Sequence, residues 1–102
     1  MKTDLPIACE LSAAELQARR EGLLPGLLAL ARERVPVRNG WRWRFAPSGE
    51  FLTTAARMID AERQCCRFLN FHLLVEQDGG DMWLEVTGPE GTAEFLEALT
   101  KE

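Results

Sequence analysis

Hydrophobic and polar positions alternate along several short stretches of the chain, and these stretches predict four β-strands. Residues 41–45 read WRWRF, so that Trp41, Trp43 and Phe45 alternate with two arginines. Strict alternation of this kind is typical of a strand with one buried face and one solvated face. Residues 6–11, 69–76 and 82–87 show weaker forms of the pattern, and the DGGD of residues 78–81 is typical of a hairpin turn between the last two.

A first helix is predicted between the strands at 6–11 and 41–45. Ser12 precedes Glu15 by three residues, which is the spacing of a capping box, and we expect the helix to continue to about Arg34. Pro25 lacks an amide hydrogen, so it predicts a kink or two shorter helices. Residues 36–40 are interpreted as a turn. The apolar positions of this helix are Leu16, Leu23, Leu24, Leu27 and Leu30.

Two further helices complete the predicted order of elements. Ser48 is expected to cap a helix over residues 49–67, and Thr92 a short helix near the end of the sequence. The order is then β-α-β-α-β-β-α over a single domain, residues 1–102. Because each strand has one apolar and one mixed face, we expect an α+β fold: a two-layer sandwich in which helices pack on one face of a four-stranded sheet.

Composition and charge narrow the classes of function. The chain has 102 residues, 46% hydrophobic and 27% charged, with a net charge of -4. An acidic balance argues against a nucleic-acid partner, which requires clustered positive charge, and the arginines of residues 41–45 are expected on a solvated strand face. No stretch approaches the roughly 20 apolar residues of a membrane span, so we expect no membrane partner and a cytoplasmic location with reduced thiols.

The second helix carries an acidic residue on its apolar stripe. Glu62 falls near the middle of that stripe, and Cys65 and Cys66 follow at the spacings that bring side chains into contact. A buried carboxylate must be protonated, paired, hydrogen-bonded or bound to a metal. The apolar members of the stripe are Phe51, Ala55, Met58, Ile59, Cys66 and Leu69, whereas Arg57, Asp60, Arg63 and Gln64 fall on the solvated side.

This arrangement leads to the main functional hypothesis, a site for a soft metal ion. Thiolates select zinc, copper(I), mercury(II) and similar thiophilic ions, so Cys65 and Cys66 are the predicted ligands. Glu62 would be a further ligand or would accept a hydrogen bond near the metal. Cys9 is a candidate third sulfur because its alternation with the apolar residues of 6–11 directs it toward the core.

Three alternatives compete with the metal site. The cysteines can simply pack, since free cysteine is among the most buried residue types. They can act in a thiol-dependent enzyme or a redox sensor, and the sequence assigns no catalytic residue that would decide this. The protein can instead form a homodimer through the open sheet face. The residues expected on that face are Arg42, Arg44, Asn70, His72, Trp83 and Glu85.

The segments ERQCCRFLNFHLLVEQDGG and LEVTGPEGTAEFLEAL resemble those of a family of small, uncharacterised bacterial proteins. The hallmarks of that family are an E-R-x-C-C-x-F segment, a hairpin and a C-terminal T-G-P-E-G helix. LSAAELQARREGLLPGLL is similar to the family's opening helix, so the resemblance covers most of the chain. A proline commonly follows the cysteine pair in such proteins, whereas Arg67 stands there in this sequence. The resemblance implies a bacterial domain and links it to heavy-metal resistance.

Overall fold

The computed structural model describes residues 23–100, apart from the side chains of a few residues at helix ends, Cys65 among them. The strand expected over 6–11 and the capping box at Ser12 lie outside the described residues. In chain order the elements are α2 (Leu23–Leu28), β1 (Glu33–Val37), β2 (Gly40–Phe45), α3 (Gly49–Cys65), β3 (Asn70–Val75), β4 (Met82–Thr87) and α4 (Thr92–Thr100). Among these residues, no helix is long and apolar enough to cross a membrane.

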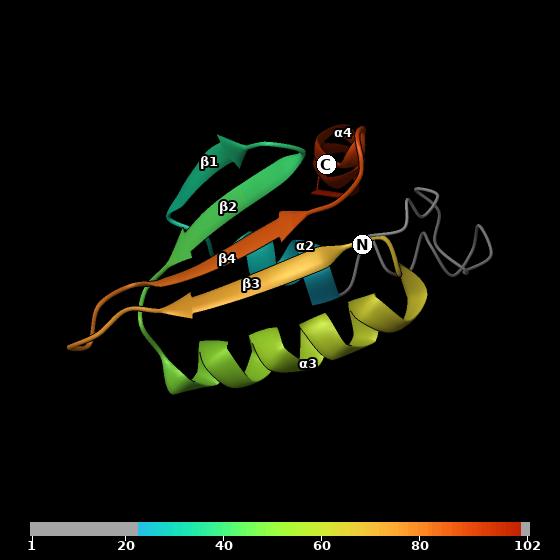
Figure 1. Ribbon diagram of the computed structural model, residues 1–102. Helices are drawn as coiled ribbons and strands as arrows, with labels where there is room; N and C mark the ends of the chain where they lie inside the picture. Colours follow the sequence, from blue (N-terminus) through green and yellow to red (C-terminus); the bar gives the residue numbers. More distant parts are fainter. Residues whose placement is uncertain (1–22, 101–102) are drawn as a thin grey trace.

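The four strands form one antiparallel sheet in the order β1-β2-β4-β3, which Figure 1 shows from its open side. Two hairpins, β1–β2 and β3–β4, lie side by side because β2 pairs with β4. In the second hairpin, the predicted turn at 78–81 is confirmed. Asp78 and Gly79 both have positive φ, as the central residues of a type I′ turn require, and the Gly80 amide donates to the Gln77 carbonyl at 3.1 Å.

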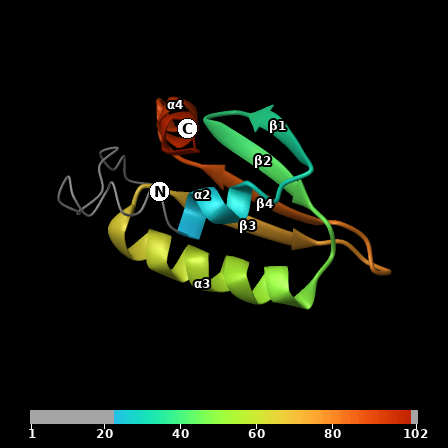
Figure 2. The ribbon, with the colours of Figure 1, turned by 180° about the vertical axis from the view of Figure 1, so that it is seen from behind.

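All the described helices pack on the same face of the sheet. Seen from behind in Figure 2, α2 lies in front of the strands, between α3 and α4. The ring of Phe45 on β2 stacks on Phe51 of α3 with centroids 4.3 Å apart, and the indole of Trp41 donates to the Ala93 carbonyl in α4. The core between the layers includes Trp43, Phe45, Ala55, Met58, Leu84, Val86 and Leu96. The predicted α+β fold with helices on one face is confirmed.

The segment before β2 differs from the sequence prediction. Helix α2 ends at Leu28 instead of continuing to Arg34, and Leu30 is 67% exposed. Glu33–Val37, where the helix end and a turn were predicted, forms strand β1 and pairs with β2. The reason is a tight turn at Arg38 and Asn39: Asn39 adopts a φ of 57° and lets the chain reverse, so that Val37 pairs with Gly40. Hydrogen bonding to β2 then outweighs continuation of the helix.

The start of α4 also differs in detail from the prediction. Thr92 was expected to cap this helix by accepting a hydrogen bond. Its hydroxyl instead donates to the Pro89 carbonyl at 2.7 Å, and the Thr92 side chain is fully buried. The Phe95 amide donates to the Gly91 carbonyl, so the first helical hydrogen bond is accepted one residue earlier than predicted.

Candidate functional site

Helix α3 places Glu62 on the covered side of the sheet. The helix begins after Ser48, whose hydroxyl accepts a hydrogen bond from the Phe51 amide at 3.1 Å, as the sequence predicted. From this start, Phe51, Ala55 and Met58 follow at helical spacing and are all buried. Glu62 continues the stripe and is 2% exposed. The prediction that this carboxylate lies on the face directed at the sheet is confirmed.

Cys66 lies one helical turn after Glu62 and is also 2% exposed. The predicted helix end at residue 67 is late by two residues, because α3 ends at Cys65 and Cys66 is its C-cap. The Cys66 amide still donates to the Glu62 carbonyl at 2.7 Å, so the two residues remain in helical register. Glu62 takes part in a further interaction besides this backbone bond.

The sulfur of Cys66 is part of a disulfide in this structure. The chain has three cysteines, and the other two are Cys9 and Cys65. The sequence analysis treated all three as reduced thiols, so the oxidised state of Cys66 is new information about this region. A disulfide also shows that a second sulfur approaches Cys66 within bonding distance.

The described side chains form only part of the predicted metal site. Among them, no group of three or more histidine, cysteine, aspartate or glutamate residues is arranged to hold a metal ion. Cys9 lies outside the described residues, as does the side chain of Cys65, so Glu62 and Cys66 are the two predicted ligands whose burial can be compared directly. These two lie on the same buried side of α3.

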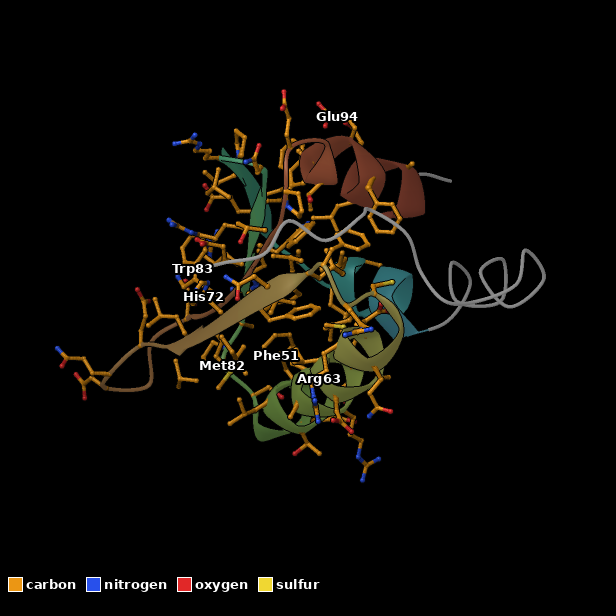
Figure 3. The ribbon with its side chains drawn as sticks, turned by 45° about the vertical axis from the view of Figure 1, so that its right-hand side comes forward. Phe51, Arg63, His72, Met82, Trp83 and Glu94 are labelled. Atoms are coloured by element: carbon orange, nitrogen blue, oxygen red, sulfur yellow. The ribbon has the colours of Figure 1, made fainter. Side chains whose placement is uncertain are left out.

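The open face of the sheet is a second candidate surface. His72 and Glu85 lie opposite each other in the β3–β4 register, as do Arg42 and Glu85 in the β2–β4 register. Paired residues of antiparallel strands share a face, so these three side chains form one row. Figure 3 shows His72 and Trp83 on the same side of the sheet, away from Phe51. The predicted membership of the open face is therefore confirmed for these residues.

Ion pairs occupy much of this open face. Arg42 Nη2 lies 2.9 Å from Glu85 Oε1, and His72 Nδ1 lies 3.6 Å from Glu85 Oε2. Arg44 bonds both Glu33 and Asp81, at 2.9 and 3.0 Å. The hydrogen bond to Glu33, followed by that to Asp81, raises the pKa of Arg44 above its ordinary value. The arginines of β2 thus have carboxylate partners, which agrees with a structural role for them.

A shallow groove runs across the same face, with a volume of about 410 Å³. Charged groups surround one large aromatic ring there, and the guanidinium of Arg42 lies 6.0 Å from the ring centroid of Trp83. The lining residues are Arg42, His72, Leu74, Glu76, Trp83 and Glu85. Four of these six residues were predicted on the open face. Leu74 and Glu76 were not, although Leu74 alternates with His72 in β3 and Glu76 follows the strand with the same parity.

Strand β1 adds residues to the open face that the sequence analysis missed. Val35 lies opposite Arg42, and Glu33 opposite Arg44, so both belong to this side of the sheet. Asn39 was the signal that could have identified them, because asparagine tolerates the positive φ that a tight turn between two strands requires. No protein-family model, curated protein or solved structure matches this chain in the comparisons with known proteins.

Proposed function

We propose that the protein binds a soft metal ion, such as zinc, copper(I) or mercury(II), through thiolates at the end of α3. The observation that supports this most is the state of Cys66, whose buried sulfur is bonded to another sulfur. The carboxylate of Glu62 lies one helical turn earlier on the same buried side. Two sulfurs and an oxygen near each other form a donor set that thiophilic ions accept.

Metal binding would require the reduced protein. A dithiol reductant transfers two electrons and two protons to the disulfide and leaves two thiols, each of which loses its proton when it ligates a metal. Two sulfurs that form a disulfide belong to neighbouring side chains, and after reduction both are candidates to ligate one ion at about 2.3 Å. In this proposal Cys65 and Cys66 are the ligands, Glu62 is a ligand or a hydrogen-bond acceptor, and Cys9 is a candidate third sulfur.

A metal titration tests the proposal directly. Protein reduced with a phosphine, which does not compete as a thiol would, is titrated with each of zinc, copper(I) and mercury(II) in the presence of a competing chelator. We expect the reduced wild-type protein to bind at least one of these ions more tightly than the Cys65→Ser/Cys66→Ser double variant does. Equal affinity for all three ions in the two proteins would contradict the proposal.

Single variants separate the proposed ligands from one another. Cys66→Ser should weaken binding by about tenfold or more, because a hydroxyl replaces a thiolate as the soft ligand. Glu62→Gln keeps the shape and most hydrogen bonds of the side chain, so a weaker effect is expected if the carboxylate only accepts a hydrogen bond. Cys9→Ser assigns the third sulfur. Circular dichroism of each variant verifies that the fold is retained.

The disulfide also favours a second candidate function, a redox switch. In that case the functional event is the interconversion of thiols and disulfide, and no metal is required. The rate of alkylation of the reduced protein as a function of pH distinguishes the two. A thiolate that titrates well below about 8.5 favours redox chemistry, because reactive cysteines have lowered pKa values.

A further inference from the structure

The two edges of the sheet have different chemistry. Strand β1, at one edge, contains Pro36, which has no amide hydrogen, and the charged residues Glu33 and Arg34. Strand β3, at the other edge, is NFHLLV and contains no proline, glycine, lysine, arginine, aspartate or glutamate. Proline and charge are the usual means by which proteins prevent pairing at an exposed edge. The β1 edge has both, and the β3 edge has neither.

The backbone of β3 has hydrogen-bonding groups directed away from the sheet. The Glu76 amide donates to the Asp81 carbonyl. This bond shows which alternate residues of the hairpin have backbone groups directed at the partner strand. Residues at even positions of β3 therefore bond to β4, and the N–H and C=O groups of Phe71, Leu73 and Val75 point to the open edge. Within residues 23–100, no strand pairs with that side of β3. Unpaired backbone groups of this kind are a template for another strand.

Apolar side chains at this edge are incompletely covered. Phe71 and Leu73 pack against the core but are only half-buried, and Val75, on the same face, is 49% exposed. On the open face, Leu74 is 55% exposed. A strand added beside β3 would cover side chains on both faces while it satisfied the backbone groups. The incompletely buried apolar side chains and the outward-directed backbone N–H and C=O groups therefore lie at the same edge of the sheet.

We propose that β3 pairs antiparallel with β3 of a second copy of this chain, across a twofold axis, to form one continuous sheet. Paired residues share a face, so Leu73 lies opposite Leu73 of the second copy and Phe71 opposite Val75. In this register the N–H and C=O groups of Phe71, Leu73 and Val75 from each copy all find partners. On the open face, His72 lies opposite Leu74.

Charge favours a second copy of β3 as the occupant of this edge. A charged partner segment would find no opposite charge in β3. A second copy of β3 has the same uncharged, largely apolar side chains, so no charge would be left without a partner. In the proposed register no two like charges are opposed, because Glu76 lies opposite Asn70 and His72 opposite an apolar residue. The proposal is independent of the sulfur site, since none of these contacts involves a cysteine.

Sedimentation velocity of the full chain, in the presence of reductant to remove disulfide-linked species, tests the proposal. We expect the mass to rise from monomer to dimer with protein concentration. Val75→Pro removes an edge amide without disturbing the hydrogen bonds to β4. Twofold symmetry then removes two interchain hydrogen bonds, so the dissociation constant should rise by about tenfold or more. Equal dimerisation of this variant and the wild type would overturn the proposal.

A second variant and a matched control keep the test decisive if Val75→Pro fails to fold. Leu74→Lys introduces a charge at the exposed edge and should also weaken the dimer. Leu30→Lys removes another exposed leucine, which lies outside β3, and should leave the dissociation constant unchanged. Dimerisation lost in all three variants alike would contradict a specific role for the β3 edge.

Hydrogen exchange at the edge amides identifies the occupant. In the dimer, the amides of Phe71, Leu73 and Val75 should exchange more slowly as the protein concentration rises, and Val35 of β1 should show no such dependence. Two outcomes would overturn the proposal. One is a monomer at all concentrations whose edge amides are protected, which would mean that another segment of the same chain covers β3. The other is a monomer whose edge amides exchange freely.

Discussion

The two faces of the sheet are built from alternate residues of the same strands but depend on different interactions. Along β4, Met82, Leu84 and Val86 are buried against the helices, whereas Trp83 and Glu85 lie on the open side. The covered face buries apolar area, which contributes about 25 cal/mol for each Å² removed from water. The open face pairs charges in contact with water, where each pair contributes about 1 kcal/mol or less. We therefore expect the stability of this fold to come mainly from one face.

The ion pairs that Arg44 forms on the open face with Glu33 and Asp81 respond little to pH near neutrality. The carboxylates of Glu33 and Asp81 raise the pKa of Arg44 above its ordinary value. A raised pKa means that folding favours the charged form, so this contribution is present below the unfolded-state pKa and is lost only as the pH rises through the folded-state value. Arg44 is thus charged throughout the range in which proteins are normally handled, and its ion pairs connect β2 with Glu33 of β1 and with Asp81, the residue before β4.

The largest difference between the faces is expected from Leu84→Ala. Leu84 is fully buried in the central strand β4, so the substitution leaves a cavity and should lower the free energy of unfolding by about 2–5 kcal/mol. Chemical denaturation measured by tryptophan fluorescence provides the value. Glu85→Ala, at the next position but on the open face, is the matched control and should cost about 1 kcal/mol or less. Similar losses in the two variants would contradict the comparison.

An intermediate effect is expected from the cap that starts α3, the helix covering the sheet. Ser48→Ala removes the oxygen that accepts a hydrogen bond from the Phe51 amide. The loss should be about 1 kcal/mol, because the amide then relies on water alone. Ser48→Asp restores an acceptor at the same position and should recover most of the stability. Failure of the aspartate to restore it would mean that the hydroxyl acts through another contact.

The smallest effect is expected from the pair between Arg42 and Glu85. A double-mutant cycle with Arg42→Ala and Glu85→Ala measures their coupling, and we expect about 0.2–1 kcal/mol because both groups are in contact with solvent. The coupling should decrease as salt is added. A coupling of several kcal/mol, insensitive to salt, would mean that the open face is shielded from water, as a bound partner would shield it.

The candidate site at the end of α3 could be predicted in part. Glu62 and Cys66 were assigned to the buried stripe from helical periodicity alone, and both are buried. Periodicity works here because a capped helix of regular pitch has a predictable face. The oxidised state of Cys66 could not be predicted, since it depends on where a second sulfur lies in space. The ligand roles of Cys65 and Cys9 stay predictions.

Local signals in the sequence were sufficient to predict α3, the β3–β4 hairpin and which residues of β2 face the helices. In each case the determining interaction lies within a few residues: a serine cap, an Asp-Gly turn, an alternation of tryptophan and arginine. Only the tertiary structure decided that β2 pairs with β4 and that β3 therefore lies at an edge of the sheet. Strand pairing depends on hydrogen bonds between segments distant in the chain, whose order no local pattern specifies.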